Sequence, residues 1–179
     1  LCDDARLRTV QAEMREHLTA NFKETDLFKV LQTGVLVTID KADPSIMPKI
    51  PELLKLRAAI YSPQFRAMVQ EMTGCAPLTD RIDCSANVYP RSGHLLCHDD
   101  VIGTRCISYI VYLTDPDDGW DEVDGGALEL YPVESPGTPA VDPSVSLLPK
   151  WNSMAFFTVQ PGRSFHAVQE VFADGKPRL

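Results

Sequence analysis

The amino-acid pattern changes after Cys75, and this change limits the fold more than any other feature of the chain. Beyond Cys75, apolar residues alternate with polar ones or come in short runs, and clusters of Gly, Pro and Asp separate the runs. Both patterns are typical of short β-strands. The sequence predicts strands at 81–89, 93–97, 105–114, 126–131, 145–148, 154–159 and 165–172.

The residues before Cys75 have helical spacing instead. Apolar residues that lie three and four apart predict one buried helix face at Leu7, Val10, Met14 and Leu18. Asp3 or Asp4 can cap the start of this helix. A second helix is expected to begin at Pro51, and a third to begin at Pro63 and end at Gly74.

Two details of this helical part bear on the fold. Segment 22–37 fits either a helix or short strands that are split at Gly34. In the third helix, we expect Met68 and Met72 to fill the core. Helices followed by many short strands predict an α+β fold, with a sheet sandwich or jelly roll that is buttressed by the N-terminal helices.

An apolar run at 95–97 leads into a His-x-Asp motif, His98 and Asp100. Residues two apart in an extended strand project from the same face, so an imidazole and a carboxylate would lie side by side. With His166 downstream, they would form the two-histidine, one-carboxylate triad of non-haem Fe(II) oxygenases. The motif alone also fits a strand end with a polar rim. A zinc site at Cys97 and His98 is disfavoured, because adjacent strand residues point to opposite faces.

The alternation within 105–114 suggests a pocket wall. One face of this strand carries Ile107, Tyr109, Val111 and Leu113. The other face carries Cys106, Ser108, Ile110 and Tyr112. Small residues beside a phenol suit a ligand-lined interior, although a strand buried on both faces explains the pattern equally well.

Composition sets limits on the class of protein. A chain of 179 residues with 44% hydrophobic residues fits one globular domain. We see no run as long as a membrane span and no secretory signal. The five cysteines are odd in number and lack CxxC spacing, which favours free thiols in a reducing compartment. A net charge of −8 argues against direct nucleic-acid binding and is compatible with a basic protein partner or with simple solubility.

Segment 115–124 is strongly acidic and contains Trp120. Its acidic residues are Asp115, Asp117, Asp118, Asp121, Glu122 and Asp124. Such a run is usually a solvated loop, and it lacks the EF-hand pattern of a calcium site. Capture of a basic polypeptide is the functional alternative.

The end of the sequence suggests an anion-binding arginine. Asp174 and Gly175 predict a hairpin turn that would place Arg178 nearly opposite Val171. Val171 is five residues beyond His166, which is roughly 16 Å along a strand. An arginine that reaches back toward the metal would leave a gap for a small dicarboxylate. A solvent-facing arginine is the alternative.

Several segments together resemble the ribosomal prolyl hydroxylase family of Fe(II)- and 2-oxoglutarate-dependent oxygenases. The resemblance runs from about residue 89 to the end, and the helical part resembles the family only loosely. The segments that carry it are 94–105, 109–113, 125–131, 151–157 and 164–171.

The resemblance implies a double-stranded β-helix within a single catalytic domain, 1–179, with helical support over about 1–76 and the β-helix over about 77–179. His98, Asp100 and His166 would be the catalytic metal ligands, and Tyr112 and Arg178 would bind 2-oxoglutarate. The cofactor would be Fe(II), with 2-oxoglutarate and O₂ as cosubstrates and ascorbate in support. The substrate would be a proline of a basic small-subunit ribosomal protein at the decoding centre, modified in the nucleus or cytoplasm, with no direct nucleic-acid or membrane partner.

The chain departs from the family pattern in lacking the second, non-catalytic barrel that members commonly carry. It also stops one residue after Arg178, so we expect the native strand to continue further. An oxygenase with another protein or small-molecule substrate is one alternative function. A metal-binding barrel without turnover is the other, although it would need neither Tyr112 nor Arg178.

Overall fold

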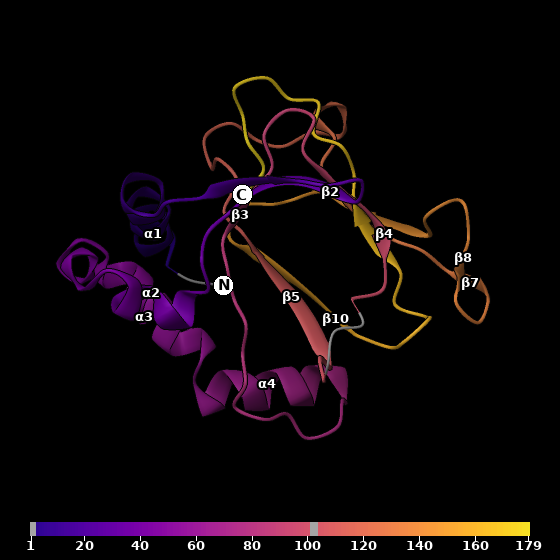
Figure 1. Cartoon of the computed structure of the whole chain (residues 1–179), viewed down its shortest axis with the longest axis horizontal. Coiled ribbons are helices and arrows are strands. Elements are labelled where there is room, and N and C mark those ends of the chain that lie inside the picture. Colours follow the sequence, from indigo (N-terminus) through magenta and orange to yellow (C-terminus); the bar gives the residue numbers. More distant parts are fainter. Residues whose placement is uncertain (1–2, 101–103) are drawn as a thin grey trace. The chain divides into compact units, whose positions relative to one another are not determined.

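The computed structural model describes residues 3–100 and 104–179. The chain forms two compact units (Figure 1). The helical unit comprises Leu1–Asn21 and Gln32–Asn87, and the barrel unit comprises Phe22–Leu31 and Val88–Leu179. None of the helices in the described part of the chain is both long enough and apolar enough to cross a bilayer.

The helical unit contains the three predicted helices and some shorter turns of helix. Its elements are α1 (Asp4–His17), η1 (Leu36–Thr38), α2 (Ile39–Ala42), η2 (Pro44–Lys49), α3 (Pro51–Ile60) and α4 (Pro63–Thr73). Asp3 caps α1 by accepting a hydrogen bond from the Arg6 amide at 3.0 Å. Gly74 ends α4 in the left-handed conformation, at φ 63°, where glycine has no steric penalty.

The core of this unit uses a residue that the apolar pattern does not reveal. Val10, Leu36, Ile50 and Leu53 form the buried cluster. Glu13 is buried beside them on α1, and its carboxylate accepts hydrogen bonds from the first amides of α3, 2.7 Å from the Leu53 nitrogen. Since no side chain caps α3 at Ile50, Glu13 satisfies amides that would otherwise lack partners.

The prediction for the two methionines of α4 is wrong. Met68 is 38% exposed and Met72 is 62% exposed, whereas Val69 is the buried residue of this helix. Their spacing fits an apolar stripe, but that stripe is wider than the face that the helix buries.

The barrel unit is built from antiparallel strands, which are β1 (Asn21–Glu24), β2 (Phe28–Gln32), β3 (Asn87–Val88), β4 (His94–His98), β5 (Ile107–Tyr112), β6 (Leu128–Leu130), β7 (Val133–Ser135), β8 (Thr138–Pro139), β9 (Val145–Leu147), β10 (Ser153–Thr158) and β11 (His166–Val168). The larger sheet has the order β1-β2-β4-β11-β6-β9, with β3 paired to β2. The smaller sheet pairs β10 with β5, and β7 and β8 form a separate hairpin.

Most of the predicted strands are present, and several of them are shorter than expected. Segment 22–37 contains β1, β2 and η1, which answers the question that its sequence left open. The strand predicted at 81–89 is reduced to β3, because residues 81–86 form no continuous ladder. The barrel core consists of Val30, Tyr89, Val168, Val171 and Ala173.

Candidate functional site

A bulge in β4 aims the first histidine of the His-x-Asp motif at its downstream partner. In the pairing of β4 with β11, His98 lies opposite His166 and Leu95 lies opposite Val168. β4 therefore has one residue more than β11 between the two pairs, which marks a β-bulge. The extra residue lets Leu95 pack against the barrel core while His98 still faces His166.

The structure brings the predicted triad together, as His98, Asp100 and His166 each offer a ligand atom within 4.8 Å of the others. The His98 Nε2 lies 3.5 Å from Asp100 Oδ1, and the His166 Nε2 lies 3.7 Å from Asp100 Oδ2. Asp100 lies beyond the end of β4 at φ 60°, a conformation that aspartate tolerates better than most residues. The left-handed backbone at Asp100 thus sets the direction of its carboxylate, and the extended strand that we expected through Asp100 is not formed.

Backbone carbonyls orient both imidazoles. The Nδ1 of His98 lies 2.9 Å from the Leu96 oxygen, and the Nδ1 of His166 lies 2.9 Å from the Ser164 oxygen. A carbonyl can only accept, so each Nδ1 carries a proton and donates. In the neutral imidazoles, both Nε2 atoms are then free to bind a metal.

Polar neighbours hold Asp100 in its ionised form. It accepts hydrogen bonds from the Ser108 hydroxyl at 2.5 Å and pairs with Arg105 at 2.8 Å. Burial alone would raise the pKa of Asp100, but the hydrogen bonds from His98 and Ser108 and the charge of Arg105 lower it well below its ordinary value. Sequence reasoning missed Arg105, because nothing in its spacing marks it.

The pKa values of the two histidines shift in opposite directions. Burial favours the neutral form of His98, but hydrogen bonds to Asp100 and to the Leu96 carbonyl outweigh burial and raise its pKa. Burial dominates at His166 and lowers its pKa. His166 therefore loses its proton more readily than His98. At His98, a metal ion must displace a proton to bind.

Arg178 lies in a buried aromatic setting with unused donors. It is 3% exposed, and its guanidinium carbon lies 5.0 Å from the ring centre of Tyr89 and 5.3 Å from that of Tyr112. Arg178 Nε and Nη2 and the Tyr112 hydroxyl are buried without a hydrogen-bond partner among the described residues. Burial raises the pKa of Tyr112 despite the nearby cation, so the phenol keeps its proton and can donate. This donor set fits a carboxylate.

The register predicted for Arg178 is wrong. Val171 forms a bridge with Gly125, and its backbone also bonds to Ser92 and Gly93. Because these partners occupy Val171, Arg178 pairs instead with Tyr89. The arginine nevertheless reaches the interior beside Tyr112, as the hypothesis of an anion-binding arginine requires.

Residues 84–179 match the family model of the 2OG-Fe(II) oxygenase superfamily, where 2OG denotes 2-oxoglutarate. The chain belongs to this superfamily. Its members use Fe(II), 2-oxoglutarate and O₂, as expected from the sequence. The His-Asp-His cluster suits Fe(II) by its donor atoms, and the buried donors of Arg178 and Tyr112 suit the distal carboxylate of 2-oxoglutarate.

Named relatives within this superfamily are prolyl hydroxylases. The chain is 53% identical to the prolyl 3,4-dihydroxylase OGFOD1 of Ostreococcus tauri, over 99% of this chain and 34% of that protein. It is 37% identical to the prolyl 3-hydroxylase OGFOD1 of Xenopus laevis, over 93% of this chain and 30% of that protein. The chain thus spans about a third of the length of the curated relatives it matches.

Solved structures show that the fold of the superfamily is present. A Pseudomonas putida prolyl-4-hydroxylase matches with a TM-score of 0.57 and 20% identity, over 99% of this chain and 83% of that one. A Trichoplax adhaerens prolyl hydroxylase, solved with a hypoxia inducible factor peptide, matches with a TM-score of 0.60 and 16% identity, over 97% of this chain and 74% of that one. These likenesses support the expected double-stranded β-helix and nothing about substrate.

Two residues of β5, Ser108 and Tyr112, contribute to this site, which favours the pocket-wall interpretation of the alternation over a strand buried on both faces. Ser108 bonds to Asp100, and Tyr112 lies beside Arg178. Phe157, which is paired with Ser108 on β10, packs its ring 4.5 Å from that of His166. Cys106 departs from the prediction, because it is exposed and precedes the first residue of β5.

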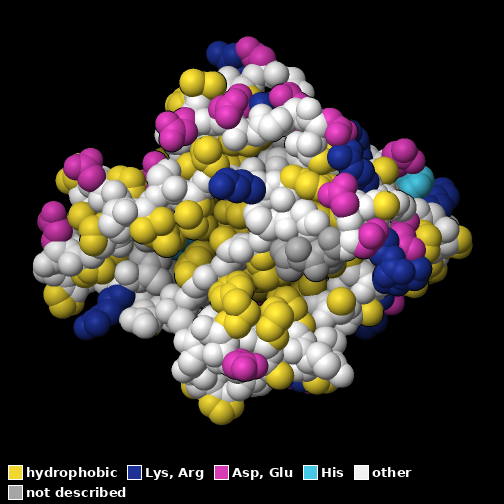
Figure 2. Space-filling view, turned by 180° about the vertical axis from the view of Figure 1, so that it is seen from behind, with side chains coloured by type: hydrophobic (Ala, Val, Ile, Leu, Met, Phe, Trp, Pro, Cys, Tyr) yellow, Lys and Arg dark blue, Asp and Glu magenta, His cyan; other side chains and the backbone are white. Residues whose placement is uncertain are grey.

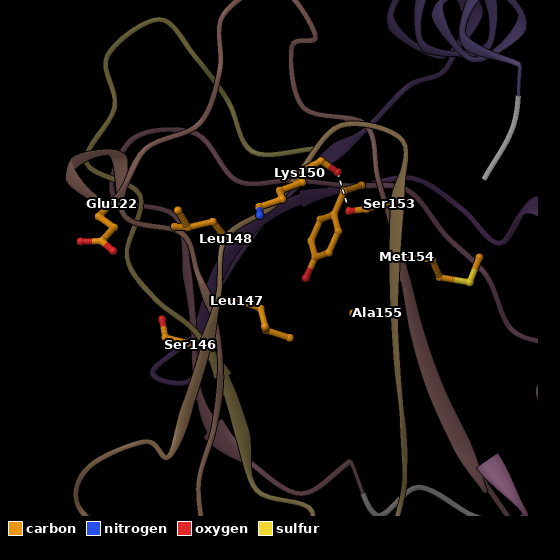
Figure 3. A pocket seen from close by; sticks show the side chains of 9 residues that line it. Glu122, Ser146, Leu147, Leu148, Lys150, Ser153, Met154 and Ala155 are labelled. Atoms are coloured by element: carbon orange, nitrogen blue, oxygen red, sulfur yellow. Dashed lines mark hydrogen bonds between the residues drawn. The ribbon is translucent and has the colours of Figure 1, made fainter. Parts of the chain in front are cut away.

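A cavity of about 360 Å³ opens beside Tyr112 (Figure 3). Its other lining residues are Glu122, Ser146, Leu147, Leu148, Lys150, Ser153, Met154 and Ala155. Apart from Tyr112, none of the predicted site residues lines it. This cavity therefore lies next to Tyr112 and is not the metal site.

The acidic loop is partly neutralised from within the barrel unit. The Lys176 ammonium lies 2.8 Å from Asp124 Oδ2 and 3.3 Å from Asp118 Oδ1. It also packs over the Trp120 ring, 5.5 Å from its centre. These contacts tie the loop to Lys176, which offsets part of its acidic charge.

Cysteine chemistry plays no part in the described site. Cys75, Cys84, Cys97 and Cys106 are free thiols, as the sequence predicts, and Cys2 lies outside the described residues. Within the described part of the chain, the potential metal cluster does not include Cys97, which contradicts the zinc alternative.

Proposed function

We propose that this chain is the catalytic part of an Fe(II)- and 2-oxoglutarate-dependent prolyl hydroxylase that acts on a small-subunit ribosomal protein at the decoding centre. The observation that carries the proposal is the buried pair Arg178 and Tyr112. The Nε and Nη2 of Arg178 and the hydroxyl of Tyr112 have no hydrogen-bond partner among the described residues, and the same barrel unit contains the His-Asp-His cluster. A barrel without turnover has no use for such a pair. The names of the relatives support proline as the target residue, and the sequence resemblance supports the ribosomal substrate.

In this proposal, His98, Asp100 and His166 hold Fe(II) through their Nε2 and carboxylate atoms. Arg178 and Tyr112 hold the distal carboxylate of 2-oxoglutarate by charge-assisted hydrogen bonds. The bound metal, cosubstrate and O₂ supply the oxidising power that hydroxylates the proline ring, with ascorbate in a supporting role.

The protein's own contribution is orientation and a shielded site. Backbone carbonyls fix the tautomers of both histidines, so each Nε2 is ready to bind. Ser108 and Arg105 keep Asp100 ionised and in place. Arg178 is positioned against two phenol rings and excluded from water, which strengthens its attraction for a carboxylate.

The charge of the chain fits a basic protein substrate. At −8, the chain would attract a cationic ribosomal protein, and the nucleus and cytoplasm are where such a substrate occurs. The space-filling view shows acidic side chains spread over the visible face, with Lys and Arg side chains among them (Figure 2). We propose no direct nucleic-acid or membrane partner.

Mass spectrometry tests the proposal directly. The chain is incubated with Fe(II), 2-oxoglutarate, ascorbate and the ribosomal protein, and we expect one or more added oxygen atoms on a proline together with succinate. Replacement of that proline by alanine should remove the added oxygen. Succinate without any modified ribosomal protein would favour an oxygenase with another substrate. Complete absence of succinate would favour the non-catalytic barrel.

A further inference from the structure

Asp99, the middle residue of the His-x-Asp motif, makes a contact that its position in the motif does not explain. Its side chain bonds to the segment that leads into His166, with Oδ2 accepting a hydrogen bond from the Gly162 amide at 2.9 Å. The residue between two members of the triad is thus joined to the segment that carries the third.

The partner of Asp99 is an amide that its turn leaves free. Residues Gln160 to Arg163 form a turn closed by a hydrogen bond from the Arg163 amide to the Gln160 oxygen, at 3.0 Å. Pro161 and Gly162 occupy its centre, and Gly162 has φ 66°, as a type II turn requires. The Gly162 amide has no role in closing this turn, so the Asp99 carboxylate is what fixes its direction.

A second contact joins the same two segments. The Ser164 hydroxyl lies 3.1 Å from the carbonyl oxygens of both Asp99 and Gln160, and shares its proton between them. The carbonyl of Ser164 in turn accepts the hydrogen bond from the Nδ1 of His166 at 2.9 Å. An unbroken path of contacts therefore runs from Asp99 through Ser164 to the imidazole of His166.

We propose that Asp99 is a positioning residue, which sets the place of His166 for metal binding through its hydrogen bond to Gly162 and the adjoining Ser164 contact. This inference rests on the metal site of the proposed function. The side chain of Asp99 touches neither substrate nor metal in this role. Its acceptor oxygen holds the turn, and the turn holds the carbonyl that orients His166. Loss of such an outer partner typically weakens metal binding by about 10- to 100-fold.

Mn(II) titration of the metal-free chain, followed by the electron paramagnetic resonance signal of free Mn(II), tests the proposal without turnover. We expect Asp99→Ala to weaken Mn(II) binding by about tenfold or more. Asp99→Asn keeps an acceptor for the Gly162 amide and should stay within about threefold of the unsubstituted chain. Glu134→Ala, which removes an exposed carboxylate from β7, is the control for charge loss and should leave Mn(II) binding unchanged.

Hydrogen exchange at the Gly162 amide reports on the contact itself. In the metal-free chain, exchange should be faster in Asp99→Ala than in Asp99→Asn or the unsubstituted chain. Ser164→Ala offers an independent variant. The chain with both substitutions should lose less Mn(II) affinity than the product of the two single fold-changes, because both residues act on one segment.

Three results would overturn the proposal. Asp99→Ala that binds Mn(II) as tightly as the unsubstituted chain would show that the turn does not set His166. Equal weakening in Asp99→Asn and Asp99→Ala would assign the effect to charge near His98 and not to the hydrogen bond. If His98→Ala also kept full Mn(II) affinity, the metal site of the proposed function would fail together with the role of Asp99, whereas failure of the Asp99 variants alone leaves that function standing.

Discussion

The backbones of Arg178 and Tyr89 exchange two hydrogen bonds, each 2.9 Å between nitrogen and oxygen. Tyr89 also lies under the guanidinium, 5.0 Å from ring centre to carbon. The same residue thus fixes both the main chain and the side chain of the arginine. These contacts hold Arg178 in place beside Tyr112, where the first prediction tests its role.

Arg178→Lys should raise the KM for 2-oxoglutarate at least tenfold and leave Mn(II) affinity nearly unchanged, because a point charge replaces a planar fork. Tyr112→Phe should have a milder effect of about 1 kcal/mol, from the loss of one hydrogen bond. Succinate formation as a function of 2-oxoglutarate concentration measures both. Arg163→Lys, on an exposed arginine, is the control. Unchanged 2-oxoglutarate dependence in both variants would place the carboxylate elsewhere.

Gly126→Ala should impair cosubstrate binding by displacing the arginine. Gly126 has φ 67°, and an added Cβ would lie 3.1 Å from Arg178 Cδ and 3.2 Å from Trp120. The substitution is therefore strained in its backbone as well as crowded. We expect a raised KM for 2-oxoglutarate and a loss of stability of about 1–3 kcal/mol. Gly119→Ala is the matched control, because no atom outside its immediate chain neighbours lies within 4 Å of the added Cβ.

Each triad residue should be indispensable for metal binding. His98→Ala, Asp100→Ala and His166→Ala should lose Mn(II) binding and turnover together, because a facial triad has no spare ligand. His94→Ala, on the same strand but with its Nδ1 bonded to the Ser92 oxygen, should keep both. Tight Mn(II) binding in any of the three triad variants would contradict the assignment.

Metal binding should weaken with falling pH because His98 must lose its proton first. Its pKa is raised above 6.5, so the charged form persists to higher pH than in an ordinary histidine. In the metal-free protein, the raised pKa of His98 stabilises the fold at pH values below the pKa of His98 in the unfolded chain. This stabilisation disappears as the pH rises through the pKa of His98 in the folded protein. Asp100 has a lowered pKa, and its contribution is present above its unfolded value and is lost only in strong acid. Calorimetry in buffers of different ionisation enthalpy should detect proton release on Mn(II) binding near neutral pH. A net uptake would contradict the direction given for His98.

The sequence reveals the chemistry of the site better than its geometry. His98, Asp100 and His166 stand out only together with the segments that resemble the oxygenase family, because a His-x-Asp motif alone also fits a strand end with a polar rim. The β4 bulge does not stand out, because Leu95, Leu96 and Cys97 are all apolar and no alternation shows which of them is the extra residue.

Long-range contacts explain two other differences between the sequence prediction and the structure. Arg178 was predicted to pair locally across the Asp174-Gly175 turn, but its partner Tyr89 is remote in sequence and carries no local signal. The sequence does not reveal Glu13 as a helix cap, because Glu13 lies on α1 and the amides that it satisfies belong to α3. Residue type thus identifies candidate ligands, while register depends on contacts that no single segment contains.

The last prediction concerns how the proposed basic substrate is captured. Within the acidic loop, Lys176 forms ion pairs with Asp118 and Asp124. The substitutions Asp117→Asn and Glu122→Gln leave both Lys176 ion pairs in place. We therefore expect them to test electrostatic steering with little change in the fold. They should lower kcat/KM for the ribosomal protein at low salt, and leave substrate-independent decarboxylation of 2-oxoglutarate unchanged.

Ionic strength separates steering from direct contact. The deficit of the doubly substituted chain should shrink as salt rises, because screening weakens the advantage of the unsubstituted chain over about 10 Å at 0.1 M. Lys176→Met provides the opposite test, because it breaks the pairing with Asp118 and Asp124 and makes the loop more acidic. If the loop acts by charge, Lys176→Met should raise the low-salt association rate, provided that thermal unfolding shows the barrel intact. A deficit that stays constant from low to high salt would leave the loop as a local contact surface, with no long-range role.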